Sequence, residues 1–238
     1  MNCFRGDNKW KIIGVICLLW LFAACNKTAE ITGHISQNPQ KYAMLYKMLP
    51  YELEFMDTIL LVKGKFSYLL HPDEMTIYVL RFNDTCFASF AMKDGDKIHI
   101  EAEYPDMNRS MDIQGNEETR LMLQTRRQLF LLDDRVKILS EQFIQNSGSL
   151  SPDSLNQYLM LQYDTLYHQH KLWLKEFILS HPQYLASLTA YYQTLGRNAF
   201  FSWSEDRYLL DTLYQYLSQT YPNSMYVCDL AEKLGNDD

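Results

Sequence analysis

The sequence predicts an α+β protein: an N-terminal antiparallel β-sandwich or partly open barrel, then an all-helical region with a long antiparallel helix hairpin. Apolar and polar residues alternate with a period of two from Ala29 to about Ile113, as is typical of strands. After Gly115 the apolar period changes to 3.6, as is typical of amphipathic helices. We therefore expect a β-domain over residues 29–114 and a helical domain over residues 115–238.

About seven or eight short strands are expected, because turn residues repeatedly interrupt the alternating pattern. They cover Ile31–Ile35, Tyr42–Lys47, Leu53–Phe55 with Thr58–Val62, Phe66–Leu69, Thr76–Phe82, Cys86–Met92, Lys97–Glu103 and Met111–Ile113. Asp94–Asp96 predicts a hairpin turn with Gly95 at positive φ. A calcium loop is the alternative, but the regular ladder of acidic residues and the closing glutamate are missing.

The helical half opens with one long helix from about Asn116 to Gln145, whose first turn holds Glu117 and Glu118, where acids suit the helix dipole. Asn146–Leu150 breaks this helix, and Ser151–Pro152 restarts it with an N-cap residue and a proline at the first helical position. A short polar loop between two long helices makes an antiparallel hairpin. Shorter helices are expected over about Tyr184–Leu195, Ser204–Gln219 and Ser224–Leu234.

The first 24 residues are predicted to be a lipoprotein signal peptide. Basic residues precede an apolar run over residues 12–24, which ends in Ala24 directly before Cys25. A transmembrane anchor is the alternative, but a span needs about 20 apolar residues and polar residues end this run earlier. We expect cleavage between Ala24 and Cys25, lipidation of the Cys25 thiol, and a short tether over residues 25–28 that holds the protein on a membrane.

Charge and cysteine usage narrow the classes of partner and chemistry. The formal net charge is −7, without a cluster of basic residues, which argues against nucleic acid as a partner. Outside the signal peptide and Cys25, only Cys86 and Cys228 remain, and no Cys-x-x-Cys pair occurs. A disulfide between them is one alternative. We favour the other, in which each packs as a small buried hydrophobe.

No catalytic, metal or cofactor-binding residue is predicted. His168 and His170 are two residues apart on a helix and so point to opposite sides, whereas metal-binding pairs need a spacing of three or four. His34 and His99 fall on strands whose partners the sequence does not specify. The run Phe201–Ser204 lacks the Gly-x-Ser-x-Gly elbow of hydrolases.

The abundant tyrosines of the helical half give the one positive indication of binding. They stand at positions 158, 163, 167, 191, 192, 208, 214 and 216. Most are expected in the core, and some on an exposed aromatic surface, since tyrosine is enriched at interfaces.

A series of short motifs occurs in a recognisable order: Ile31–Ile35, Val62–Ser67, Tyr78–Phe82, Asp94–Glu101 and Ile113–Glu117, then Phe177–Pro182, Leu213–Leu217 and Pro222–Ser224 with Tyr226. The first five resemble the β-domain called domain of unknown function 4369, and the others are similar to the helical linker after it. In that family both parts are the N-terminal region of lipid-anchored, thioredoxin-like thiol–disulfide oxidoreductases of Gram-negative bacteria. The resemblance implies an outer-membrane location facing the periplasm.

The family's activity is not expected to carry over. In the family a thioredoxin domain with its Cys-x-x-Cys site follows the helices, whereas this sequence ends at Leu234–Asp238. Thiol exchange needs an attacking thiolate and a resolving partner. We expect a non-enzymatic, membrane-anchored binding or accessory module that docks a protein, such as a separate thioredoxin-like partner, through its tyrosine-rich helices. Two alternatives stay open: a lone redox thiol at Cys86 or Cys228, and a truncated family member.

Overall fold

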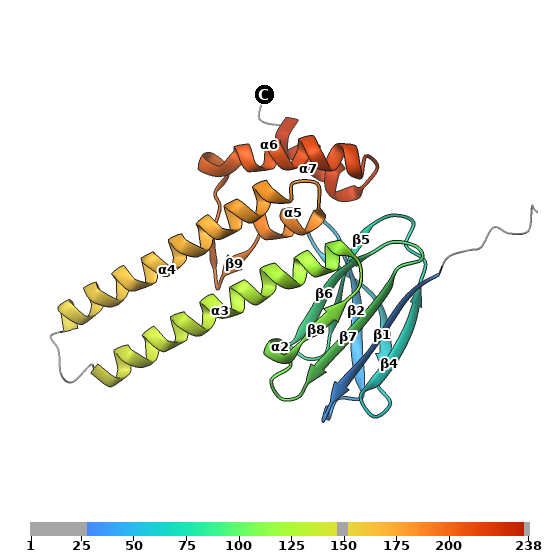
Figure 1. Cartoon of the computed structure of the whole chain (residues 1–238), viewed down its shortest axis with the longest axis horizontal. Helices are drawn as coiled ribbons and strands as arrows, with labels where there is room; N and C mark the ends of the chain where they lie inside the picture. Colours follow the sequence, from blue (N-terminus) through green and yellow to red (C-terminus); the bar gives the residue numbers. More distant parts are fainter. Residues whose placement is uncertain (1–27, 147–151, 236–238) are drawn as a thin grey trace, which may run out of the picture.

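A computed structural model describes residues 28–146 and 152–235. Strands dominate the chain before Gly115 and helices dominate it afterwards, which confirms the predicted α+β class (Figure 1). The predicted signal peptide, Cys25 and the break between the two long helices lie outside the described residues.

Two four-stranded sheets face each other as an open sandwich, not as a closed barrel. Sheet A has the order β4–β1–β7–β8, formed by Lys65–Leu70, Ala29–Ser36, Lys97–Glu103 and Asp112–Gln114. Sheet B has the order β3–β2–β5–β6, formed by Leu53–Leu60, Tyr42–Met48, Thr76–Arg81 and Phe87–Met92. The apolar residues that point between the sheets, such as Ile31, Leu45 and Phe90, are fully buried. Hydrophobic burial between two sheets therefore explains the alternation in the sequence.

The predicted antiparallel pairing is wrong at one pair of strands. β1 and β7 run parallel, with Ile31 beside Ile98 and Ile35 beside Ala102. Parallel neighbours need a long crossover, and strands β2 to β6 supply it. The turn at Gly95 has the expected positive φ of 84°, but it links β6 to β7 between the sheets instead of closing a hairpin. A short helix that the sequence did not predict, α2 (Met107–Ser110), precedes β8.

The predicted helix hairpin is confirmed. Its arms are α3 (Glu117–Asn146) and α4 (Pro152–Ser180), and they project away from the sandwich while the remaining helices gather at their root (Figure 1). Those helices are α5 (Leu185–Tyr191), α6 (Trp203–Thr220) and α7 (Met225–Gly235). The expectation of an all-helical region is wrong after α5, where β9 (Thr194–Leu195) and β10 (Asn198–Ala199) form a hairpin. α5 has already ended at Tyr191, and Gly196 lies at the turn of this hairpin with a φ of 60°, a backbone conformation that glycine adopts easily.

A second core joins the sandwich to the helices. Ile77 and Ala91, on the outer face of sheet B, are buried together with side chains of α3, α4, α5, α6 and α7. Tyr78 and Leu80 on the same strand point into the sandwich core. β5 is therefore buried on both faces, which explains its continuous apolar sequence.

The first turn of α3 holds the two cores together. Thr119 Oγ1 accepts from the Ala91 N–H at 3.1 Å and donates to the Ala91 carbonyl at 2.9 Å. Asn116 caps the helix by accepting from the Thr119 N–H at 2.9 Å. Glu118 lies in the first turn of α3, as predicted, and it is 2% exposed and binds the start of α5. One helical turn therefore fixes β6 and α5 at the same time.

Candidate functional site

The histidines and acids that the sequence singled out do not meet in a cleft. His170 is buried and its Nε2 lies 2.7 Å from Gln193 Oε1, while His168 is exposed, so the two do point to different sides. His99 Nδ1 lies 2.9 Å from Thr32 Oγ1, and its Nε2 lies 3.3 Å from Glu101. That row resembles a nucleophile, base and acid in order, but it lies on the open outer face of sheet A with His99 44% exposed. Within residues 28–146 and 152–235, no group of three or more His, Cys, Asp or Glu could hold a metal.

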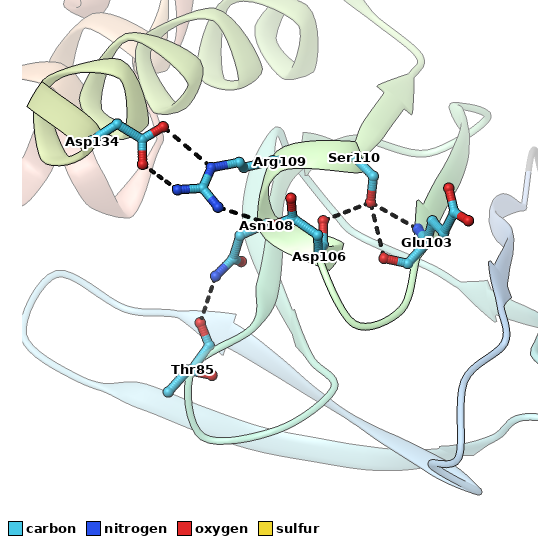
Figure 2. Close-up of polar contacts among 7 residues, drawn as sticks. All are labelled: Thr85, Glu103, Asp106, Asn108, Arg109, Ser110 and Asp134. Carbon is cyan, nitrogen blue, oxygen red and sulfur yellow. Dashed lines mark hydrogen bonds and ion pairs between the residues drawn. The ribbon is translucent and has the colours of Figure 1, made fainter. Parts of the chain in front are cut away.

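The polar cluster around α2 holds that helix in place. Arg109 pairs with Asp134 of α3, and Nδ2 of Asn108 donates to the Thr85 carbonyl at 3.1 Å (Figure 2). Ser110 Oγ accepts from the Glu103 N–H at 2.8 Å. These contacts join α2 to α3, to the segment at Thr85 and to β7. The Arg109 side chain is 54% exposed. The cluster therefore serves to attach α2 to its neighbours.

The two folded cysteines differ in exposure. Cys86 is 4% exposed and shares the core-facing side of its strand with Ala88 and Phe90, which confirms the expected packing. Burial raises the pKa of the Cys86 thiol, although nearby Arg126 lowers it by less. Cys228 is exposed, so the expectation that it packs in the core is wrong: its side of α7 faces solvent. Neither Cys86 nor Cys228 forms a disulfide. The raised pKa keeps the buried Cys86 thiol protonated, which is the unreactive form of the group.

The tyrosines of the helical half are more exposed than predicted. Only Tyr191 of the eight is buried, Tyr163 and Tyr167 are half-buried, and the other five, at positions 158, 192, 208, 214 and 216, are between 37% and 56% exposed. The long helices α4 and α6 lie at the periphery and bury only one face each, which leaves their tyrosines in solvent.

A bare apolar surface lies on sheet B, at a place that the sequence analysis did not single out. Ala43 and Leu45 of β2 point into the sandwich core, so the alternate residues point outward. The cross-strand pairs Tyr42–Leu60 and Tyr46–Phe55 place β3 side chains on the same outer face. Helices cover the β5–β6 half of this face, but Tyr42, Leu60 and Phe55 stay 55% to 56% exposed. We call six of the outward apolar residues of β2 and β3 (Tyr42, Met44, Tyr46, Leu53, Phe55 and Leu60) the apolar face.

A pocket of about 260 Å³ lies where the β2–β3 connection meets α5 and α7, and we call it the interdomain pocket. Its apolar walls come from Met48, Leu49, Pro50, Ile77 and Leu188. The Tyr226 hydroxyl helps to close it, because this group donates to the Met48 carbonyl at 2.7 Å and accepts from the Ile77 N–H at 3.0 Å. α7 is thereby tied to β2 and β5.

An ion pair lies at the rim of the interdomain pocket. Lys233 Nζ lies 2.9 Å from Asp229 Oδ2 and donates to the Tyr192 hydroxyl at 3.3 Å. The same ammonium lies over the rings of Tyr51 and Tyr192, 4.8 and 5.1 Å from their centroids. Burial lowers the pKa of Lys233, but the hydrogen bonds and charge interactions with Asp229 and Tyr192 together raise it by more, so the ammonium stays charged. Among the described residues, Asp229 Oδ1 is buried without a hydrogen-bond partner.

No protein-family model and no curated protein matches the chain. The geometry of the structure is therefore the guide to function. None of the helices in the described part of the chain has the length and apolar character that a membrane span requires.

Proposed function

We propose that this protein is a lipid-anchored binding module of the cell envelope that docks a protein partner through the apolar face. The observation that carries the proposal is the partial covering of sheet B. Three side chains of the face, Tyr42, Phe55 and Leu60, are each more than half exposed on adjacent strands. Contiguous exposed apolar residues of this kind mark interaction sites on soluble proteins.

The composition of the apolar face suits a protein surface. Its rings are already ordered, with Tyr46 and Phe55 edge to face at 5.7 Å and the Arg81 guanidinium over Tyr46 at 5.3 Å. Aromatic and arginine side chains in such arrangements dominate the energetics of protein interfaces. An open sheet face also offers a broad contact area, as a protein partner requires. A separate thioredoxin-like protein remains our preferred partner class, on the strength of the sequence resemblance.

The proposed lipid at Cys25 would set how the module is held. β1 begins at Ala29, four residues after Cys25. Four extended residues reach at most about 14 Å. The start of β1 would therefore lie close to the headgroups of the bilayer that holds the acyl chains.

Metabolic labelling tests the anchor. Cells that express the chain are grown with a radiolabelled fatty acid, and the protein is isolated and counted. We expect label in the wild-type protein and none in Cys25→Ala, because the thiol is the acceptor of the lipid. Cys228→Ala is the matched control, since this exposed thiol should not affect labelling. Equal labelling of wild type and Cys25→Ala would rule out the proposed anchor.

Site-specific photo-cross-linking in cells tests the docking surface. We expect a benzophenone side chain at position 55 to form a discrete adduct with one protein, and Leu60→Ser to weaken that adduct several-fold. The matched control is a benzophenone at position 69, because Leu69 is 60% exposed on β4 of the other sheet. Identical adducts from the two positions would contradict docking on the apolar face. Leu60→Ser should change the free energy of unfolding by less than about 0.5 kcal/mol, since its side chain is exposed.

A further inference from the structure

Helix α4 carries a second apolar stripe on the side away from its packed face. The packed face lies against α3, α5 and α6, and side chains such as Leu174 and Phe177 are buried there. Four other apolar side chains of the same helix stay between 45% and 63% exposed: Tyr158, Leu161, Leu172 and Leu179. A surface helix normally buries one apolar stripe and turns polar residues to solvent. The second stripe is therefore a helix face without a partner inside the described fold.

The spacing of this stripe is that of a coiled-coil seam. Its positions advance alternately by three and four residues, so they fall on one side of the helix. We call it the α4 seam, and its members are Tyr158, Leu161, Thr165, His168, Leu172, Lys175 and Leu179. The seam covers three heptads, about 32 Å of helix. A stripe of this length and spacing fits another helix that lies alongside α4.

The members of the seam determine how two copies of α4 can pair. In a parallel pair each residue faces the same residue of the second copy, so two Lys175 ammonium groups would meet and repel each other. In an antiparallel pair Leu161 of one copy faces Leu172 of the other, and a two-fold axis repeats this contact. Lys175 then faces the Tyr158 ring of the second copy, which is a favourable cation–π contact. The seam therefore matches a second copy of itself in the antiparallel direction.

The charges beside the seam are complementary in the same arrangement. Asp164 and Lys171 flank the seam on one side of α4, and the antiparallel pairing brings Asp164 of each copy near Lys171 of the other. Lys171 Nζ also pairs with Asp206 Oδ2 of α6 at 2.8 Å, which holds the ammonium beside the seam. Opposite charges that flank a helix pair set the choice of partner and the orientation. This charge pattern favours a second copy of the chain as the occupant of the seam.

We propose that the protein forms an antiparallel dimer through the α4 seam, with Leu161 of each copy against Leu172 of the other. The two hairpins then make one four-helix layer, in which the two α4 helices lie in the middle and each α3 lies outside its own α4 (Figure 1). The seam is on α4 and the apolar face is on sheet B, so the dimer does not depend on the protein docking proposed above.

Light scattering of the purified chain tests the dimer. We expect twice the mass of a single chain for the wild type. Leu161→Asp should weaken association at least tenfold, because the dimer would bury this carboxylate without a partner. Met160→Asp is the matched control, since Met160 is 68% exposed on the same helix and points away from the seam, and it should leave the dimer intact. Both exposed substitutions should leave the circular dichroism spectrum unchanged.

Disulfide trapping between two differently tagged copies tests the orientation. Both copies carry Cys228→Ser, which removes the exposed thiol. Leu161→Cys in one copy and Leu172→Cys in the other should give a linked dimer on oxidation, because the facing β-carbons come close enough for a disulfide. Either variant alone should give none, since the antiparallel pairing puts the two copies of residue 161 about 16 Å apart.

Four results would each overturn the proposed dimer. They are a single-chain mass for the wild type, a dimer that Leu161→Asp leaves unchanged, no disulfide in the mixture of the two cysteine variants, and a disulfide formed by either variant alone. The trapping experiment needs no disruptive substitution, so it remains decisive if Leu161→Asp perturbs the fold.

Discussion

Glu118→Ala is expected to lower the free energy of unfolding by about 3–5 kcal/mol. The Glu118 side chain lies where α3, α5 and the end of α6 meet, and it is 2% exposed. Its Oε1 accepts from the Leu185 N–H at 2.8 Å and from the Tyr221 hydroxyl at 2.7 Å, and its Oε2 accepts from the Ala186 N–H at 2.9 Å. Truncation leaves these donors without their acceptor, and a buried unpaired donor costs about 1–3 kcal/mol.

Urea denaturation of the purified wild-type protein and of Glu118→Ala measures this effect. Glu117→Ala is the matched control, because the neighbouring side chain is 47% exposed and pairs with Arg120 on the surface. An exposed pair of this kind contributes at most about 1 kcal/mol. If the two variants were equally stable, the structural role assigned to Glu118 would be wrong.

The ionisation of Glu118 adds a pH dependence with a definite sign. Burial raises the pKa of Glu118, and the hydrogen bonds to Ala186, Tyr221 and Leu185 lower it by less, so its pKa in the folded protein lies above the usual value. Its contribution to stability is therefore fully present below about pH 4.3, the usual glutamate value, and declines as pH rises through the raised pKa. Glu118→Gln cannot ionise, so the stability of the wild type relative to this variant should fall over that window.

Phe90→Ala is the second large effect, expected to lower the free energy of unfolding by about 3–5 kcal/mol. Phe90 is fully buried between the sheets and its ring stacks on Tyr78 at 6.1 Å. Removal of the ring leaves a cavity that neighbouring strands cannot close, since both sheets are held by their hydrogen bonds. Phe87→Ala on the same strand should cost less, because that side chain is 40% exposed.

Urea denaturation of the wild type and of Phe90→Ala measures this effect and also tests whether the two cores unfold together. β5 contributes Tyr78 to the first core and Ile77 to the second, so the loss of the sandwich removes one wall of the helical core. We expect helical signal and aromatic near-ultraviolet signal to be lost in a single transition for wild type and for Phe90→Ala. Two separate transitions would show that the sandwich and the helices are independent units.

Local periodicity was enough to predict most elements of the fold. Alternation fixed the strands because each buries one face, and helices α3, α4, α6 and α7 were recognisable from their apolar stripes and their bounding turns. Pairing was not predictable in this way. The parallel contact of β1 with β7 joins segments about 70 residues apart, and nothing in either strand specifies its neighbour. The early end of α5 was not predictable either, because the helix stops at Tyr191 and Thr194–Leu195 pairs with Asn198–Ala199 instead of continuing it.

Neither the apolar face nor the interdomain pocket could be found from the sequence, for related reasons. The apolar face arises because helices cover half of sheet B and leave the other half open, which is a property of the tertiary structure alone. The interdomain pocket brings Met48, Leu188 and Asp229 together from three distant segments. Glu118 shows the same limit on a smaller scale: a first-turn acid suits a helix dipole whether it is solvated or buried. Only the packing of α5 onto α3 decides between the two.

The attachment of α3 has a mechanical consequence. A helix of 30 residues is about 45 Å long, and α3 is fixed near its first turn to both β6 and α5 while its far end extends beyond the sandwich. The hairpin is thus a lever with its fulcrum at Glu118 and Thr119. A small force at the tip produces a large torque at the fulcrum, where it acts on the β-sandwich and the α5 wall of the interdomain pocket at once.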